Sequence, residues 1–243
     1  MSTLFISDLH LCPSRPWIAR LFRDFLAGPA RGAEALYILG DLFEYWAGDD
    51  DLGDAFNADV CAALRTLSDT GVPLYFMAGN RDFLIGERFA RAAGMTLLPD
   101  PALIEVGGVP TLLMHGDTLC TDDEAYQAFR LEVRSPEWQQ AFLALPLDRR
   151  KAQIDALRRE SESQKRIKPI DIMDANPAAV LQGLTFHLSQ RLIHGHTHRP
   201  ALHRLEIGGQ GCERWVLPDW YEEGGYLVCD GGGCRLQHWP AAA

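Results

Sequence analysis

Side chains able to bind metal ions stand just after several apolar segments of the chain, each beside a glycine. The densest example is LIHGHTHRP at 192–200, where three histidines alternate with Gly195 and Thr197. Taken alone, this stretch is compatible with a metal site, a proton relay or the polar end of a strand. Four further segments of the same kind are Asp8-Leu9-His10, Gly40-Asp41, Gly79-Asn80-Arg81-Asp82 and His115-Gly116-Asp117.

Together these segments carry the donor atoms of a binuclear metal centre. Residues two apart on an extended chain point the same way, so the Asp8 carboxylate and the His10 imidazole converge. The carboxyl ends of parallel strands are where α/β proteins bind ligands. A lone histidine or aspartate at a strand end is more often structural, but this set supplies three oxygen ligands and four imidazoles. The candidates are Asp8, His10, Asp41, Asn80, His115, His196 and His198.

The donor set also indicates which ions and which chemistry to expect. Nitrogen and oxygen ligands without a thiolate suit Mn²⁺, Fe²⁺ or Zn²⁺, and two Mn²⁺ ions per chain are our prediction. Asp41 would bridge them, since each of its oxygens can hold one ion. Two ions about 3.5–4 Å apart activate a hydroxide and neutralise charge on a phosphoryl group.

Alternating apolar strands and amphipathic helices must position these side chains. Apolar segments at 3–7, 35–40 and 73–79 are separated by helical spacing over 17–27 and 53–70. This βαβαβ order predicts a largely parallel sheet covered on both faces. Further strands are expected at 102–106, 110–115, 191–195, 201–207, 213–217, 226–230 and 235–239. No linker divides the chain, so we expect a single domain, 1–243.

A long helical block over about 122–188 interrupts this pattern. Its apolar residues are numerous for helices that cover one sheet face, so it is either a helical subdomain with its own core or a cap beside an apolar pocket. Between Arg149 and Lys168, eight Lys/Arg stand against three Asp/Glu, a local charge of +5 that leaves −15 elsewhere. This stretch could face phosphates or anionic lipid, or be a solvated helix face. The net charge of −10 argues against a nucleic-acid binder.

The cysteines and the N-terminus indicate the compartment. Six cysteines without CxxC pairs predict reduced cytosolic thiols, and Cys229 and Cys234 bracket an expected turn between strands. The start MSTLFISDLH lacks a basic region, so we expect no signal peptide. No segment approaches the ~20 apolar residues of a transmembrane helix.

The ordered set D-x-H, G-D, G-N, H and G-H-x-H over residues 8–198 resembles the calcineurin-like binuclear metallophosphoesterases. The resemblance implies an α/β fold, a β-sandwich of two sheets flanked by helices. It also implies that Asp8, His10, Asp41 and His198 hold one ion. Asp41, Asn80, His115 and His196 would then hold the other.

Arg81 departs from the pattern of many family members, which carry a histidine there to assist the leaving group. Arginine keeps its proton past pH ~12 and cannot act as a general acid. A leaving phosphate, with a pKa near ~6, does not require one. It benefits instead from charge neutralisation by a guanidinium. Arg81 therefore favours a phosphoanhydride substrate over a phosphomonoester.

A narrower resemblance extends nearly end to end. The segments SDLHL, GDLFEYW, GNRDFLIG, HGDTLCTDD, IMDAN and HGHTHRP resemble the UDP-2,3-diacylglucosamine hydrolases of the lipid A pathway. Members cleave the pyrophosphate of UDP-2,3-diacylglucosamine to UMP and 2,3-diacylglucosamine 1-phosphate, with water attacking the α-phosphorus. The resemblance makes 122–188 a lipid-binding cap. It also implies a cytoplasmic enzyme held at the anionic inner-membrane surface by its basic stretch, with no protein partner required.

Substrate contacts follow by the same resemblance. Asn80 and Arg81 would contact the phosphates as catalytic residues, while Lys165 stands where some relatives carry asparagine. His194 is left over, and we interpret it as packed or as supporting a ligand. The implied substrate-binding residues are Asn80, Arg81, Asp123, Ser161, Lys165, Lys168 and His196. Candidates for the lipid pocket are Trp46 and Phe83, whose alternative is the core, with Tyr126, Phe129, Trp138 and Phe142.

Two other functions compete with a lipid-nucleotide pyrophosphatase. A phosphodiesterase or dinucleotide polyphosphate hydrolase would act on a soluble substrate and would not need apolar cap residues. A metal-dependent scaffold without turnover would be expected to have lost ligands, yet all seven ligand positions are occupied.

Overall fold

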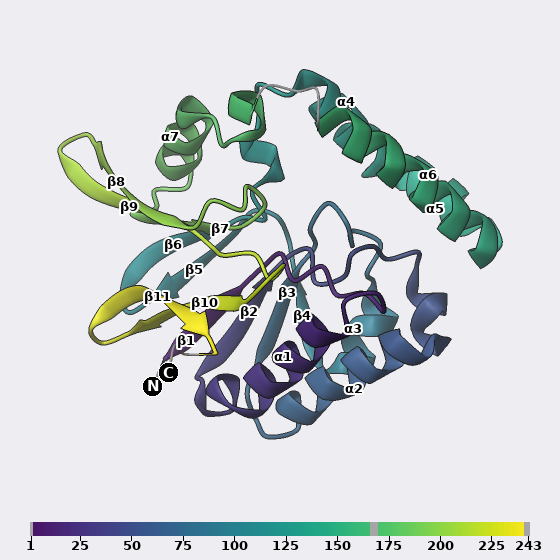
Figure 1. The fold of residues 1–243 in the computed structure, drawn as a ribbon. Coiled ribbons are helices and arrows are strands. Elements are labelled where there is room, and N and C mark those ends of the chain that lie inside the picture. Colours follow the sequence, from purple (N-terminus) through teal and green to yellow (C-terminus); the bar gives the residue numbers. More distant parts are fainter. Residues whose placement is uncertain (1, 166–169, 241–243) are drawn as a thin grey trace.

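The computed structural model describes residues 2–165 and 170–240, and it is built on two β-sheets (Figure 1). The first sheet has the strand order β11-β10-β1-β2-β3-β4. Strands β1 to β4 run parallel, and β10 pairs antiparallel to β1. Its strands are β1 (Thr3–Ile6), β2 (Ala35–Leu39), β3 (Leu74–Met77), β4 (Met95–Leu98), β10 (Gly224–Asp230) and β11 (Gly233–Trp239).

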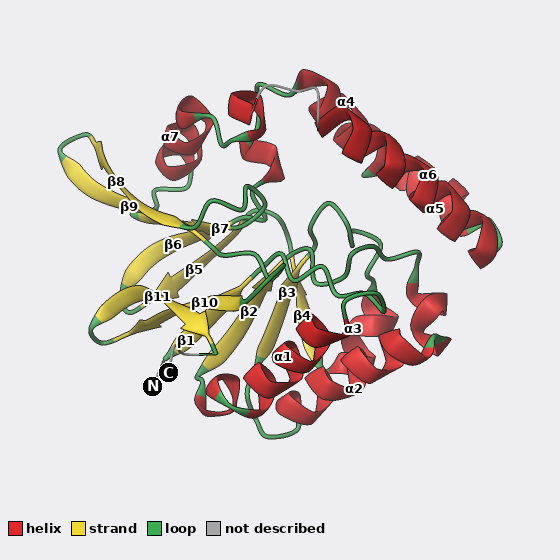
Figure 2. Cartoon of the chain, viewed as in Figure 1, coloured by secondary structure: helices red, strands yellow, loops and turns green. Residues whose placement is uncertain are grey.

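The second sheet has the order β5-β6-β7-β9-β8. Strands β6, β7 and β9 are parallel, while β5 and β8 pair antiparallel at the two edges. Its strands are β5 (Ala102–Val106), β6 (Val109–Leu113), β7 (Arg191–His194), β8 (Ala201–Ile207) and β9 (Gln210–Val216). The two mixed sheets, with helices on their outer faces (Figure 2), confirm the predicted α/β class.

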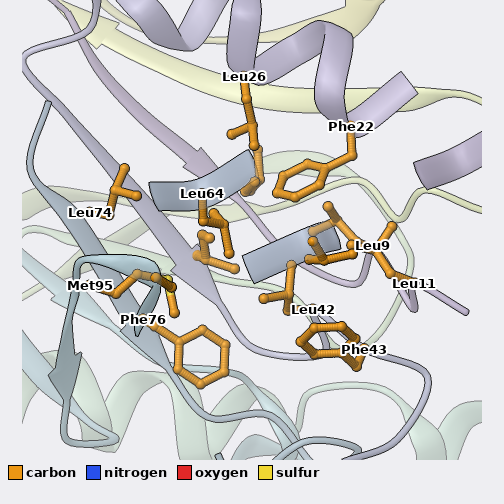
Figure 3. Close-up of a cluster of buried hydrophobic side chains, with 14 of the residues drawn as sticks. Leu9, Leu11, Phe22, Leu26, Leu42, Phe43, Leu64, Leu74, Phe76 and Met95 are labelled. Atoms are coloured by element: carbon orange, nitrogen blue, oxygen red, sulfur yellow. The ribbon is translucent and has the colours of Figure 1, made fainter. Parts of the chain in front are cut away.

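Three hydrophobic clusters separate these layers. The first lies between the first sheet and the helices α1 (Pro16–Ala27), α2 (Ala55–Ser68) and α3 (Glu87–Ala93), and Figure 3 shows part of it. The second fills the space between the sheets. Residues alternate between them along β1, since Leu4 and Ile6 enter the first cluster and Phe5 the second. The third lies between the second sheet and α7 (Pro177–Phe186).

Most predicted elements are present, with two additions. Helix α3 and strand β4 were not predicted. Each is short, seven and four residues, so neither shows a clear periodicity. The face of the parallel sheet away from α1–α3 is covered by the second sheet rather than by further helices.

The helical block divides into two parts. Helices α4 (Glu124–Val133), α5 (Pro136–Leu143) and α6 (Leu147–Lys165) extend away from the sheets (Figure 1). Helix α7 instead buries Val180 and Leu184 against the second sheet. The segment that stands apart from the sheets is therefore shorter than 122–188. We refer to α4–α6 as the cap.

The prediction of uniformly reduced thiols was wrong for one pair. Cys229 and Cys234 are joined by a disulfide across the β10–β11 hairpin. The antiparallel register places the two residues directly opposite each other, with their Cα atoms 4.1 Å apart. Sequence spacing alone does not reveal that register. The other four cysteines are free.

Candidate active site

The carboxyl ends of parallel strands from both sheets bring the candidate ligands together. Asp8 follows β1, Asp41 follows β2 and Asn80 follows β3, while His115 follows β6 and His196 follows β7. Backbone pairing continues past the strands and ties these loops together. The Asp8 N–H donates to the Gly40 carbonyl at 3.1 Å and the Gly195 N–H to the His115 carbonyl at 2.8 Å.

One group of donor atoms gathers around His10 and His198. Their Nε2 atoms are 3.4 Å apart, and the His198 Nε2 lies 3.4 Å from the Asp8 Oδ1. The His10 Nε2 is also 3.8 Å from the Asp41 Oδ2. Asp8 is held in place through its other oxygen, which accepts from the Ser7 hydroxyl at 2.6 Å and from the His196 backbone N–H at 2.8 Å.

A second group gathers around the Asn80 amide oxygen. This oxygen lies 3.0 Å from the His115 Nε2 and 2.9 Å from the His196 Nδ1. The Asp41 Oδ1 is 3.8 Å from the same His115 nitrogen, so the two oxygens of Asp41 face the two groups. The other ring nitrogen of His115 lies 2.8 Å from the Leu39 carbonyl, which orients the ring. All seven predicted ligands therefore lie in one continuous cluster.

The backbone at this cluster is strained. Five candidate ligands have positive φ angles between 49° and 67°, namely Asp8, His10, Asp41, His196 and His198. Leu188 is the one other non-glycine residue in this region among the described residues. Such conformations cost about 1–3 kcal/mol each and persist where surrounding contacts impose them. Because these conformations are concentrated at the cluster, we infer that the contacts that place the side chains outweigh the conformational cost of the backbone.

Close packing explains why glycine accompanies the ligands. A Cβ on Gly79 would collide with the Asp41 carboxylate, and a Cβ on Gly195 would collide with Asp8 and Ser7. Glycine is therefore needed at these two positions, because a larger residue would prevent the donor atoms from coming together.

Two buried carboxylates support the cluster and were not singled out from the sequence. Asp82 accepts backbone N–H groups from Leu42 at 2.7 Å and from Gly79 at 2.9 Å, which joins the loops that carry Asp41 and Asn80. Asp117 accepts from the Tyr126 hydroxyl and from the Arg130 Nε, both at 2.8 Å, and so anchors helix α4. Both aspartates stand two residues from a candidate ligand in the sequence, and this proximity is the one feature that could have indicated their supporting role.

Burial and neighbouring charges place three of the candidate ligands, His196, His10 and Asp8, in the forms that bind cations. Burial lowers the pKa of His196 to about 3 and that of His10 well below its usual value, so both imidazoles are neutral at pH 7. Burial raises the pKa of Asp8, but His198, whose Nε2 lies 3.4 Å from the Asp8 Oδ1, outweighs burial and holds this pKa well below the usual range. Neutral imidazoles and ionised carboxylates are the forms that bind metals.

The field at the cluster is negative. Burial lowers the pKa of His115, but the carboxylates of Asp41, Asp117 and Asp8 overcome this and raise it to about 9. Burial raises the pKa of Asp41 to about 7. The shift at His115 shows that the surrounding carboxylates attract positive charge, and the charges of Asp82 and Asp8 add to burial in raising the pKa of Asp41.

These observations fit the residues to divalent cations. Among the described residues, the Asp8 Oδ1 is buried without a hydrogen-bond donor, although His10 and His198 surround it. Asp8, His10 and His198 form one group of possible ligands, and Asp8, Asp41 and His115 form another, with donor atoms within 4.8 Å of one another. A cation held between these donor atoms would supply the partner that the Asp8 Oδ1 lacks.

The residues expected to contact substrate lie in different parts of the structure. The Arg81 backbone N–H donates to the Asp41 Oδ1 at 2.8 Å. Asp123 caps α4, since its carboxylate accepts from the Tyr126 N–H at 3.1 Å. Ser161 and Lys165 fall in the last turns of α6, and Lys168 lies outside the described residues.

The aromatic candidates for a lipid pocket separate into three groups. Trp46 is 1% exposed and packs against Phe43 and Phe89. It is therefore a core residue, which is the alternative that the sequence left open. Trp138 stacks on Phe142 at 4.6 Å and lies against Phe83.

The other two candidates lie on α4. The Tyr126 ring lies 6.1 Å from His196, which places it beside the ligand cluster. Phe129 is 40% exposed on the cap.

His194 is packed, as expected. Its Nδ1 lies 2.8 Å from the Gly195 carbonyl, and its Nε2 accepts from the Arg214 Nε at 2.9 Å. Both ring nitrogens are therefore engaged away from the ligand cluster. Burial lowers the pKa of His194 to about 3, which keeps it neutral.

The fold and the clustered donor set are those of a known class. A family model described as calcineurin-like phosphoesterase matches residues 1–200. The chain belongs to this family and is a metal-dependent phosphoesterase.

Its relatives define the class more narrowly. A protein of Aromatoleum aromaticum named UDP-2,3-diacylglucosamine hydrolase is 58% identical over 96% of this chain and 95% of that protein. Proteins of the same name from Xanthomonas oryzae pv. oryzae and Stenotrophomonas maltophilia are each 52% identical, over 98% and 97% of this chain and 98% of each relative. The resemblance inferred from the sequence is confirmed by this identity over nearly the full length.

Proposed function

We propose that this enzyme hydrolyses the pyrophosphate bond of UDP-2,3-diacylglucosamine to UMP and 2,3-diacylglucosamine 1-phosphate in lipid A biosynthesis. The observation that carries the proposal is the convergence of all seven donor residues beside Arg81, in a chain whose relatives bear that hydrolase name. The relatives' names support the substrate, and the donor cluster supports metal-dependent hydrolysis.

The donor residues divide into two sets in this proposal. Asp8, His10, Asp41 and His198 would hold one Mn²⁺, and Asp41, Asn80, His115 and His196 would hold the other. The facing oxygens of Asp41 support its bridging role. When bound, the ions supply charge stabilisation at the phosphoryl group and a water that is nucleophilic at neutral pH.

Water forms the new bond to the α-phosphorus, and the bond from that phosphorus to the bridging oxygen breaks. Arg81 neutralises the sugar phosphate that leaves, which needs no proton from a general acid. Asn80, Asp123, Ser161, Lys165, Lys168 and His196 are the remaining proposed substrate contacts.

The cap is proposed to receive the acyl chains. Apolar side chains exposed on α4–α6 support this role, since an apolar surface exposed to water favours contact with lipid. They are Phe129, Leu131, Leu143 and Leu157, exposed by 40%, 72%, 42% and 40%. Trp138, Phe142 and Phe83 lie together where the cap meets the loop after β3.

We further propose that the enzyme is cytoplasmic and binds the anionic inner-membrane surface peripherally. No helix in the described part of the chain is long and apolar enough to cross a membrane. Several α6 cations already pair with acidic residues after β2, as in Arg150–Asp50 and Lys151–Asp51. Attraction to lipid therefore depends on the other basic residues of α6, and flotation with anionic against neutral vesicles measures it.

Turnover of UDP-2,3-diacylglucosamine and of its deacylated analogue, in Mn²⁺ and then in chelator, tests the proposal. We expect fast hydrolysis of the acylated substrate alone and none in chelator. Equal turnover of both would exclude the lipid role of the cap and favour a hydrolase of soluble nucleotides. Reaction in ¹⁸O water should label UMP, and label in the sugar phosphate would contradict attack at the α-phosphorus.

A further inference from the structure

Glu44 occupies a position between the ligand cluster and the cap that the proposed function does not explain. It lies in the loop after β2, three residues beyond Asp41, and is 9% exposed. Two guanidinium groups hold its carboxylate. The Oε2 accepts from Arg15, and the Oε1 accepts from Arg158 of α6 at 2.8 Å. These bonds fix the direction in which the carboxylate points.

The same carboxylate faces His10 from the side opposite the ligand cluster. The Oε2 of Glu44 lies 4.0 Å from the His10 Nδ1, whereas the His10 Nε2 faces Asp41 and His198. The Nδ1 is buried and has no hydrogen-bond partner among the described residues. A shift of about 1 Å would bring these two atoms to a normal hydrogen-bond length.

Neighbouring contacts hold the plane of the His10 ring. Tyr221 stacks on it with ring centroids 5.1 Å apart and planes within 6°. The Arg15 guanidinium lies over the Tyr221 ring, 4.8 Å from its centroid, and donates a hydrogen bond to the His10 carbonyl at 2.6 Å. With the plane held, a hydrogen bond at Nδ1 is the contact that aims Nε2 within that plane.

We propose that Glu44 is a positioning residue, which accepts the Nδ1–H of His10 and aims its Nε2 lone pair into the ligand cluster. Histidines that bind metals commonly donate their other ring nitrogen to a carboxylate, and loss of that partner lowers metal affinity about 10–100-fold. The inference rests on the proposed function, because it assumes that His10 binds a cation.

Mn²⁺ titration calorimetry on chelator-treated protein compares Glu44→Gln with Asp51→Asn. Asp51 is the matched control, since it is buried in the same loop and pairs with Lys151 of the same helix at 2.6 Å. We expect Glu44→Gln to lower the affinity for one of the two Mn²⁺ ions about tenfold. Asp51→Asn should leave the affinity for both ions unchanged. Equal losses in the two variants would assign Glu44 to cap attachment alone and overturn the inference.

A second readout follows the His10 ring directly. In protein loaded with diamagnetic Zn²⁺, the Nδ1–H proton resonance of His10 should lie downfield in the wild type and in Asp51→Asn, and move upfield in Glu44→Gln. Should Glu44→Gln not fold, Glu44→Asp keeps the charge but withdraws the oxygen from His10, and the same changes are expected.

The outcomes separate this inference from the proposed function. Wild-type protein that binds two ions, with unchanged affinities and an unchanged His10 resonance in the Glu44 variants, overturns the role of Glu44 alone. Wild-type protein that binds no Mn²⁺ refutes the metal centre itself and the inference with it.

Discussion

Asp82 offers the sharpest test of how the ligand loops are held. Its fully buried carboxylate accepts backbone N–H groups from Leu42 at 2.7 Å and from Gly79 at 2.9 Å, and from Asp41 and Phe43 at 3.2 and 3.4 Å. Asp82→Asn preserves the shape and replaces one accepting oxygen by an amide NH₂. That group faces a backbone donor, so one of the two short bonds is lost and the other is weakened.

The expected cost follows from these bonds. A hydrogen bond to a charged group contributes about 1.5–3 kcal/mol, so the substitution should lower the free energy of unfolding by about 3 kcal/mol. For a chain of this length, that corresponds to a fall in Tm of roughly 6–12 °C. Because the loops of Asp41 and Asn80 lose their link, affinity for Mn²⁺ should fall as well.

Asp49→Asn separates stability from ligand placement. Asp49 accepts backbone N–H groups from Gly86 at 3.0 Å, Arg88 at 2.9 Å and Phe89 at 3.0 Å, at the start of α3 and away from the donor cluster. We expect both variants to lower Tm in thermal unfolding, and only Asp82→Asn to weaken Mn²⁺ binding in calorimetry. Unchanged Mn²⁺ affinity in Asp82→Asn would refute the reasoning.

Three further outcomes are expected. Arg81→Ala should lower kcat at least 10²-fold, as for loss of one charge-stabilising group, with Mn²⁺ affinity intact; unchanged kinetics would remove Arg81 from the mechanism. Leu184→Ala, at a side chain 1% exposed, should cost about 2–5 kcal/mol in urea unfolding. Phe186→Ala, at a side chain 80% exposed, should stay within about 0.5 kcal/mol, and equal losses would contradict the packing of α7. Chelator should abolish turnover and lower Tm, with both restored by Mn²⁺, since a ligand of the folded state stabilises it; activity that persists in chelator would refute metal dependence.

The sequence could predict the parts of this protein that depend on local order along the chain. The βαβαβ start follows from apolar periodicity, and the positions of Asp8, Asp41 and Asn80 follow from their places after parallel strands. Arg81 could be interpreted from its chemistry alone, because no fold changes the proton affinity of a guanidinium enough to make it an acid.

Contacts between residues distant in the chain required the tertiary structure. The hairpin register that joins Cys229 to Cys234, the burial of Trp46 and the packing of α7 apart from the cap are all of this kind. Each depends on which surfaces meet, and one-dimensional periodicity gives the same pattern for a residue that faces the core and one that faces a pocket.

The candidate site shows the same division. Residue types and spacing predicted the seven candidate donors, because metal ligation demands particular atoms, and here they stand next to glycine at strand ends. Only the structure shows what surrounds them, namely Asp82, which joins two of the loops, and Glu44, whose carboxylate lies 4.0 Å from the His10 Nδ1. Such supporting contacts carry no spacing rule, since they arise where chain segments from different parts of the sequence converge in space.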